Sequence, residues 1–426
     1  MKGGFNYFII LILLFTQFYS KNLKQNKNNS EDKLLFVWEH FRHGARGPYI
    51  AVDPVTFLDF SGEKWDGIGE LTPLGYRMHY LLGISTRKKY DKFLSKTYNP
   101  NELFILSTNV NRTMNSVNSF LQGLYNNKTS INLTKTQIDR SSSILNSNYS
   151  EKINKKINEL GNNNLQGGIN LIPVHTFERS KLEFGLYEVS NCPGIDKYKN
   201  INKNRPEVIN LYEELLRHTN DTFGKYIFQF MNISDEPDYL WNKNKTNNYY
   251  LADTFFSNYY NGRELAHIKN TGIDMETFYY NSFNVTYIDT YYSEFGIPST
   301  ETVYIGVSPM LRNMLNYIDL RIKLDKNDKS DYIISNSPRF VVISGHDTSM
   351  APIDIFMKSE FDIDFKMATY ASNQIFELWK NGTTGGYSIH YLVNLEEKAV
   401  FEFENFKEKV LSKLKTPEQL RNICFP

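Results

Sequence analysis

The sequence predicts an α/β fold, with a mostly parallel sheet, helices on both faces and an inserted, mainly helical cap subdomain. Three apolar runs of strand length each end in a turn of small or polar residues: Leu34–Trp38, Leu103–Leu106 and Phe340–Ile343. Such runs are typical of strands buried on both faces of a parallel sheet. Between the second and third runs, residues 205–296 have helical periodicity and no buried-strand run, which predicts the inserted subdomain.

Residues 1–20 are predicted to be a signal peptide. A short basic start precedes the apolar run Phe8–Phe15, which is too short to span a bilayer comfortably, and Ser20 is a small residue suited to cleavage. Because Phe18 is a poor residue two positions before Ser20, the cleavage site stays open, and an uncleaved anchor is the alternative. No later segment is apolar enough for a transmembrane segment in the mature chain.

Composition favours a secreted globular protein. A chain of 426 residues that is 41% hydrophobic can form a large core or two domains. The net charge of +1 gives no reason to expect nucleic acid or an anionic membrane as a partner. In an oxidising compartment the two cysteines, Cys192 and Cys424, are expected to form one disulfide. The sequence has many Asn-x-Ser/Thr sequons, and we expect only a subset to carry glycans.

Four segments follow from these patterns. Residues 31–194 form the first part of the α/β core, residues 195–296 the helical cap subdomain, and residues 297–426 the second part of the core. Within the first part, residues 126–170 are rich in Asn, Ser and Lys and are predicted to form a polar surface insertion with at most one helix, near Glu151–Leu160.

The motif Arg42-His43-Gly44-Ala45-Arg46-Gly47-Pro48 begins where the first strand is predicted to end. Glycines let a backbone turn sharply and approach a ligand, and arginine forks match phosphate oxygens. The alternative is a turn with surface arginines and one partly exposed histidine. A second turn precedes a predicted helix that Thr72 caps and Pro73 begins. His79 in that helix is interpreted as a surface or core-edge residue.

The other two strands also end in polar residues. Arg112 follows the second strand, and His346 and Asp347 follow the third. In open α/β sheets ligands bind at the carboxyl ends of the strands, so these residues are expected to meet the first motif. Arginines and histidines gathered there, next to a carboxyl group, predict a phosphate-ester site with its own acid. His175, after a short strand, is interpreted as structural, although it could reach the site.

These motifs resemble the histidine acid phosphatases, the branch of the histidine phosphatase superfamily with an RHGxRxP motif and a distal His-Asp pair. The resemblance covers about Leu34 to Cys424 and is closest to the lysosomal and prostatic type rather than to phytases. It includes further segments in order: 69–75, 107–113, 173–176, 191–193 and 370–378. Within Leu251–Phe256, phenylalanine stands where the family has a cysteine, so two family disulfides are expected to be lost and aromatic packing to hold the cap instead.

The resemblance implies a phosphoglycerate-mutase-like fold and an acid phosphatase that hydrolyses phosphate monoesters without a metal or other cofactor. His43 is implied as the nucleophile that forms a phosphohistidine, and Asp347 as the acid that protonates the leaving group. An acid pH optimum is expected because that step needs a protonated Asp347. The residues implied to bind the phosphate are Arg42, Arg46, Arg112 and His346.

Three questions stay open at this point. A phytase-like inositol phosphate phosphatase is the alternative enzyme, and a secreted glycoprotein that binds phosphate without catalysis is the alternative outside enzymes. The expected location is the secretory pathway, either lysosomal or extracellular. The sequence does not decide between a monomer and a homodimer.

Overall fold

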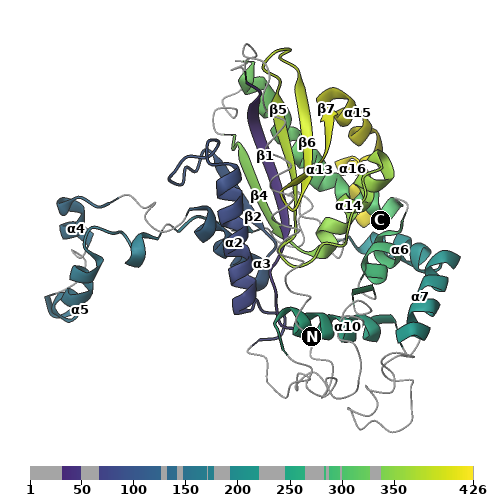
Figure 1. The fold of residues 1–426 in the computed structure, drawn as a ribbon, viewed down its shortest axis with the longest axis horizontal. Coiled ribbons are helices and arrows are strands. Elements are labelled where there is room, and N and C mark those ends of the chain that lie inside the picture. The colour runs from purple at the N-terminus through teal and green to yellow at the C-terminus, as the bar shows by residue number, and fades with distance from the viewer. Residues whose placement is uncertain are drawn as a thin grey trace, which may run out of the picture.

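A computed structural model gives the fold of the chain (Figure 1). The residues that the structure describes are 31–48, 67–125, 132–141, 147–169, 171–176, 192–219, 245–263, 283–284, 287–297, 300–326 and 337–425. The predicted signal peptide lies outside them. Among the described residues, no helix is both long and apolar enough to cross a membrane.

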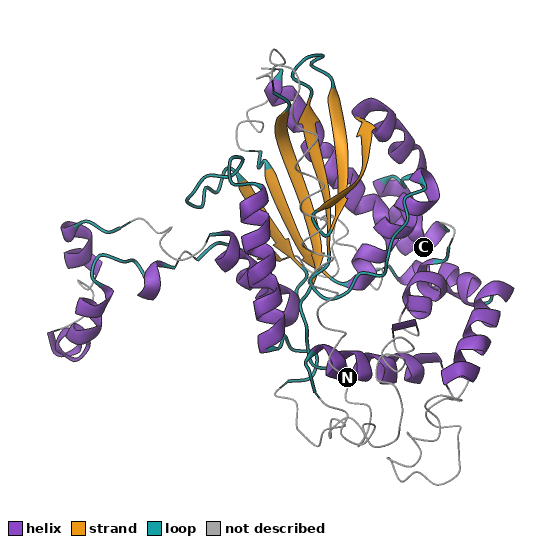
Figure 2. Cartoon of the chain, viewed as in Figure 1, coloured by secondary structure: helices purple, strands orange, loops and turns teal. Residues whose placement is uncertain are grey.

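A seven-stranded mixed sheet forms the centre of the molecule, in the order β3-β2-β4-β1-β5-β6-β7 (Figure 2). The strands are β1 (Lys33–Arg42), β2 (Leu103–Ser107), β3 (His175–Thr176), β4 (Phe340–Gly345), β5 (Asn373–Lys380), β6 (Tyr387–Val393) and β7 (Glu396–Glu402). The first four pair in parallel, and β5, β6 and β7 pair antiparallel. All three apolar runs of the sequence are strands of the parallel half. The antiparallel half was not anticipated.

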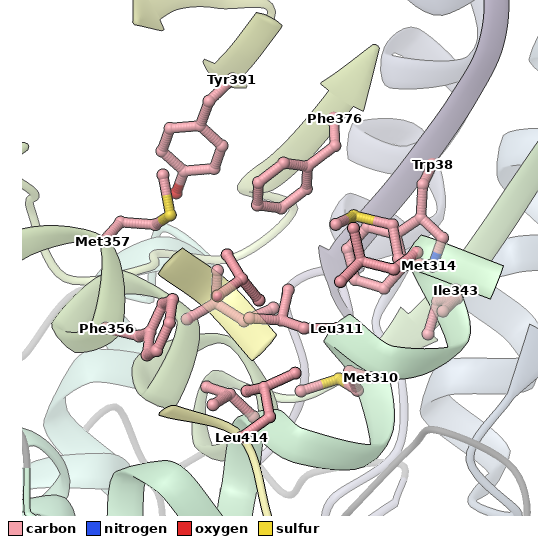
Figure 3. Close-up of a cluster of buried hydrophobic side chains, with 14 of the residues drawn as sticks. Trp38, Met310, Leu311, Met314, Ile343, Phe356, Met357, Phe376, Tyr391 and Leu414 are labelled. Carbon is pink, nitrogen blue, oxygen red and sulfur yellow. The ribbon is translucent and has the colours of Figure 1, made fainter. Parts of the chain in front are cut away.

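Helices cover both faces of this sheet, which confirms the predicted fold class. One core cluster joins Val37 and Phe41 of β1 to α3 (Asn111–Leu124) and to residues around α2 (Pro73–Lys89). The other joins Trp38 of β1 to α13 (Glu301–Asp325), α14 (Asp347–Phe361) and α15 (Phe403–Lys413), as Figure 3 shows in part. Because successive side chains of a strand point to opposite faces, β1 supplies both cores.

Helices beyond the carboxyl end of β1 make up the described part of the predicted cap. They are α6 (Asp196–Lys203), α7 (Pro206–Thr219), α10 (Lys245–Tyr260) and the π-helix η5 (Ile288–Phe295), with the 3₁₀ turn η3 (Pro193–Ile195) at the start. In the polar insertion, α4 (Lys135–Ser141) and α5 (Ser147–Leu160), followed by the turn η1 (Gln166–Gly168), extend away from the sheet (Figure 1). The insertion thus holds one more helix than we expected.

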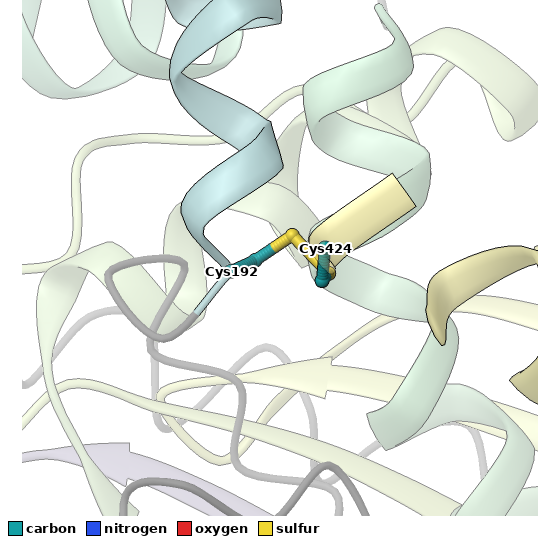
Figure 4. The surroundings of a disulfide bond; sticks show 2 residues. All are labelled: Cys192 and Cys424. Atoms are coloured by element: carbon teal, nitrogen blue, oxygen red, sulfur yellow. A yellow bond between two sulfur atoms is a disulfide. The ribbon is translucent and has the colours of Figure 1, made fainter. Parts of the chain in front are cut away.

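The predicted disulfide is present between Cys192 and Cys424, whose Cα atoms are 4.4 Å apart (Figure 4). Cys192 precedes η3 at the start of the cap, and Cys424 ends α16 (Pro417–Cys424). Both cysteines are buried. The bond therefore links the segment just before the predicted cap to α16, in the second part of the core.

Candidate active site

The carboxyl ends of β1, β2 and β4 lie side by side. In the parallel register Arg42 pairs with Gly345, and Ser107 pairs with Ser344. The residues that follow each strand therefore meet at one edge of the sheet, as in other open α/β sheets. All six predicted site residues lie there: Arg42, His43, Arg46, Arg112, His346 and Asp347.

The turn after β1 is fixed by its backbone. His43 donates its N–H to the carbonyl of Gly345 (3.0 Å) and accepts at its own carbonyl from the N–H of Ala371 (3.1 Å). A Cβ on Gly44 would lie 2.5 Å from the carbonyl oxygen of Gly75, so only glycine allows the start of α2 to pack this closely. Ala371 has a φ of 59°, a strained conformation for a residue with a side chain. The position of His43 is thus held from three elements.

His43 is buried, and its Nδ1 lies 2.9 Å from the carbonyl oxygen of Gly44. Because a carbonyl only accepts, Nδ1 carries the proton and Nε2 keeps a free lone pair. Burial, followed by the positive charges of Arg112, Arg42 and Arg46, holds the pKa of His43 well below its ordinary value. The imidazole is therefore neutral at acid pH, which is the state a nucleophile needs.

Arg42 faces Asp347. Its Nη2 lies 2.7 Å from Oδ2 of Asp347, and its Nη1 donates to the carbonyl of Ala368 (2.8 Å). The rings of Tyr370 and Phe256 lie 4.7 and 5.7 Å from the guanidinium carbon. Such aromatic faces stabilise a cation, and they hold the guanidinium beside the carboxylate.

Asp347 begins α14 and is buried. Burial alone would raise its pKa, but the charges of Arg42, His346 and Arg46 outweigh burial and hold the pKa below its ordinary value. This balance favours the ionised form of Asp347. Its carboxylate is the partner of Arg42 in an ion pair.

Arg46 forms a second buried pair, which the sequence did not suggest. Its Nη2 and Nη1 lie 2.7 and 3.0 Å from the two carboxylate oxygens of Asp253. Asp253 belongs to α10, so this bidentate contact ties the cap to the turn after β1. A bidentate arginine–carboxylate pair fixes the orientation of the guanidinium plane.

Arg112 and His346 are also in contact. Nη2 of Arg112 lies 3.3 Å from Nδ1 of His346, while Nε2 of His346 lies 3.0 Å from the hydroxyl of Thr108. The hydroxyl of Thr113 lies 2.7 Å from that of Thr108 and donates to the carbonyls of Thr108 and Val110. Since the proton of Thr113 is engaged, the chain of donors runs from His346 to Thr108 to Thr113. This chain fixes the ring of His346.

Two other histidines do not join these side chains. His79 is fully buried rather than at a surface or core edge, and its Nε2 lies 3.1 Å from the carbonyl oxygen of Arg42. It therefore supports the backbone of the motif. His175 is exposed on the edge strand β3, with its ring stacked on Phe104.

Sequence reasoning gave no role to several residues that complete the site. Asp253 and Phe256 lie in the helical cap, where a carboxylate or an aromatic ring is a common surface or core residue. Tyr370 was noticed only as part of a family motif, and its ring also lies 5.7 Å from that of His43. Among the described residues, no group of three or more His, Cys, Asp or Glu side chains is placed to hold a metal ion.

A buried histidine with a free Nε2, surrounded by arginines and next to a carboxylate, is the kind of site that defines a phosphoric monoester hydrolase acting through a histidine. The comparisons with known proteins agree. A family model for the histidine phosphatase superfamily (branch 2) matches residues 14–394, so the chain belongs to that family. The family and the enzyme class predicted from the sequence are confirmed.

Similar curated proteins are acid phosphatases. The chain is 24% identical over 371 residues to lysosomal acid phosphatase of Rattus norvegicus, covering 86% of this chain and 72% of that protein. It is 41% identical over 96 residues to prostatic acid phosphatase of Mus musculus, covering 22% of this chain and 24% of that protein.

Among solved structures, the fold is similar to Hafnia alvei phytase in complex with tartrate, with a TM-score of 0.58 and 14% identity. That match covers 92% of this chain and all of the phytase chain. The phytase from Citrobacter braakii gives a TM-score of 0.56 and 14% identity over 90% of this chain and 98% of the other. At this identity, the likeness concerns the fold.

Proposed function

We propose that this protein is an acid phosphatase that hydrolyses phosphate monoesters through a phosphohistidine formed on His43. The observation that carries the proposal is the contact of His43 Nδ1 with the carbonyl of Gly44 (2.9 Å), because it leaves Nε2 unprotonated for attack on phosphorus. The low pKa of this buried ring supports the same role.

Three arginines and a histidine surround this nucleophile. Arg42, Arg46 and Arg112, with His346, bind the non-bridging oxygens and stabilise the charge of the phosphoryl group during transfer. Asp347 gives a proton to the oxygen of the departing alcohol. In the second half of the reaction the same carboxylate takes a proton from the water that attacks the phosphohistidine. Asp347 thus loses its proton in the first half-reaction and regains one in the second.

The proposed location is the secretory pathway, either lysosomal or extracellular. The buried disulfide between Cys192 and Cys424 supports it, because disulfides persist in oxidising compartments. The acid phosphatases to which the chain is similar include lysosomal ones, which supports it further.

Trapping of the intermediate tests the proposal. Wild-type protein is mixed with a ³²P-labelled aryl phosphate at acid pH and quenched, and the label is expected on a peptide that contains His43. His43→Ala is expected to fold, because the backbone of the turn stays in place, and to lose turnover by at least about 10⁴-fold. His175→Ala, at an exposed edge position, is the matched control and is expected to keep both label and turnover.

Two outcomes would contradict the proposal. Label and turnover retained in His43→Ala would remove His43 as the nucleophile. Binding of phosphate without turnover by the wild type would make the protein a phosphate binder. A parallel assay of inositol hexakisphosphate hydrolysis tests the alternative that the protein is a phytase-like inositol phosphate phosphatase.

A further inference from the structure

Asp347 presents a contradiction within the proposed function. A general acid must hold a proton before the leaving group departs, yet the structure places Oδ2 of Asp347 2.7 Å from Nη2 of Arg42, in an ion pair. The same guanidinium is one of the groups proposed to bind the phosphate. Nη2 of Arg42 cannot make its closest contact with the Asp347 carboxylate and with a phosphate at the same time. Phosphate binding therefore weakens the contact between Arg42 and Asp347.

The other contacts of these two residues are compatible with such an exchange. Nη1 of Arg42 stays on the carbonyl of Ala368, and Nε is buried without a hydrogen-bond partner among the described residues. Arg42 can therefore direct Nε and Nη2 toward an anion while Nη1 keeps its hydrogen bond to Ala368. Oδ1 of Asp347 accepts the N–H of Thr348 (2.9 Å). Oδ2 lies beside Nη2 of Arg42 and has no other partner among the described residues.

We propose that the phosphate of the substrate displaces Asp347 from Arg42 and that Asp347 takes up one proton as it is displaced. The inference rests on the proposed function and adds the event that prepares the acid. When the phosphate lies beside Oδ2, the Asp347 carboxylate loses its attraction to the guanidinium and is repelled by the dianion. Both changes favour the neutral carboxyl group of Asp347. Asp347 then donates a hydrogen bond where it accepted one before.

The proton has a defined source. Phosphate monoesters have a second pKa of about 6, so at acid pH the ester arrives mainly as a monoanion. Its O–H bond to a non-bridging oxygen breaks as the O–H bond to Oδ2 of Asp347 forms, and the ester becomes the dianion that the arginines bind. When the P–O bond to the alcohol breaks, the same proton passes from Oδ2 to the alcohol oxygen. The acid pH optimum then follows from proton-coupled binding and does not require a free enzyme with protonated Asp347.

Several charged or titratable groups face Asp347. They are Arg42 at the end of β1, Arg46 in the turn after it, His346 at the N-cap of α14 and Tyr291 of η5. Burial keeps Tyr291 neutral by raising its pKa well above its ordinary value. The two arginines remain charged at all relevant pH values. His346, and His43 beside it, are the other groups that could take up the proton, and the test must separate them from Asp347.

Sulfate is a suitable probe, because it has the shape and charge of a phosphate dianion and does not itself titrate in the acid range. Its binding at pH 5 is measured by calorimetry in buffers of different ionisation enthalpy, which gives the number of protons taken up per sulfate bound. We expect about one proton for the wild type and close to none for Asp347→Asn, since an amide cannot take up the proton. Asp325→Asn removes a carboxylate that pairs with Lys380 at the far end of β5 and is expected to match the wild type.

The outcomes are distinct. The exchange is wrong if the wild type takes up no proton, or if Asp347→Asn takes up as many protons as the wild type. Neither result would contradict the turnover or the labelling of His43, which test the proposed function. A wild type that binds no sulfate would contradict both the exchange and the phosphate site on which the proposed function rests. Because the measurement is made at equilibrium without turnover, a protein that binds phosphate but does not hydrolyse it can still show the exchange.

Discussion

Asp253 holds Arg46 through both carboxylate oxygens, and both side chains are buried. In Asp253→Asn the amide still accepts one hydrogen bond but offers no charge. Removal of one member of a buried ion pair is strongly destabilising, and we expect a loss of roughly 3 kcal/mol in the free energy of unfolding. Sulfate is expected to raise the melting temperature of this variant more than that of the wild type, because the anion replaces the lost charge beside Arg46.

Thermal unfolding with and without sulfate measures both effects. Asp319→Asn is the matched control, because it removes a carboxylate from a partly exposed pair with Lys407. Its cost should stay within about 1 kcal/mol and should not depend on sulfate. Equal gains from sulfate in the wild type and in Asp253→Asn would mean that Asp253 has no influence on the anion site.

Asn111 is the acceptor residue of a sequon next to Arg112. Its side chain is exposed, and its Nδ2 donates to Oε1 of Glu70 (2.9 Å). A glycan on Nδ2 would remove this contact and place a branched sugar one residue from Arg112. We therefore predict that Asn111 is unmodified, whereas the exposed Asn132 of the polar insertion is expected to be occupied.

Glycopeptide mass spectrometry of active protein from a glycosylating host measures this occupancy. Full occupancy at Asn111 in such a preparation would show that its side chain can turn along the outer face of the turn, where a sugar does no harm.

At the scale of elements, the π-helix η5 reaches the site through one hydroxyl group. Tyr291 donates to Oδ2 of Asp354 (2.9 Å) and accepts from the N–H of Ala368 (3.2 Å), whose carbonyl receives Arg42. A segment of the cap thus positions an arginine of the core. No motif in the sequence indicates this, because the link runs through a backbone group.

Tyr291→Phe removes that hydroxyl and leaves the N–H of Ala368 without this acceptor. We expect a loss of about 1–3 kcal/mol in stability and, because Arg42 loses its support, a fall on the order of tenfold in kcat/KM. Tyr125→Phe removes a buried hydroxyl that has no partner among the described residues, and it should change neither property. Unfolding curves and steady-state kinetics decide the matter, and a Tyr291→Phe enzyme with wild-type kcat/KM would restrict η5 to a structural role.

The elements also show what the sequence could predict. The three strands β1, β2 and β4 were recognised because each contains an uninterrupted apolar run that is largely buried. Their ends carried six of the site residues, since parallel neighbours align their carboxyl ends. Asp253 and Tyr291 were missed because their partners are more than 60 residues away in the sequence, and local patterns do not encode such pairings. The antiparallel half was missed for a different reason: β5 begins with Asn373 and Gln374, which are polar although both are fully buried, so its start has no apolar run.

At the scale of the molecule, buried acids make stability depend on pH. Burial raises the pKa of Glu39 to about 7, although hydrogen bonds from Asn373 and Thr86 act against it. The pKa of Glu39 is higher in the folded than in the unfolded state. The contribution of Glu39 to the free energy of unfolding is therefore fully present below about pH 4.5 and is lost as the pH rises to about 7. Burial lowers the pKa of His40 and of His79 to about 3. Their contribution to the free energy of unfolding is present above about pH 6.5 and is lost as the pH falls to about 3.

Glu39→Gln isolates one of these contributions. The amide keeps the shape, and Oε2, which has no partner among the described residues, becomes the site of the NH₂ group. Because the histidines are common to both proteins, the stability of the variant relative to the wild type should improve by on the order of 3 kcal/mol between pH 4.5 and 8. Chemical denaturation at both pH values measures this difference. A difference that does not vary with pH would mean that Glu39 is ionised in the folded protein.

The position of β1 in the sheet has a consequence for the order in which the chain can fold during its synthesis. Its neighbours are β4 and β5, so Val37 pairs with Phe340 on one side and with Glu377 on the other. Both partners are made roughly 300 residues later, which at 5–20 residues per second is a delay on the order of 15–60 s. During that time a strand with a long apolar run has two open edges, and such edges pair readily with other chains. We therefore expect β1 to need cover, for example by a chaperone, until β4 and β5 have been made.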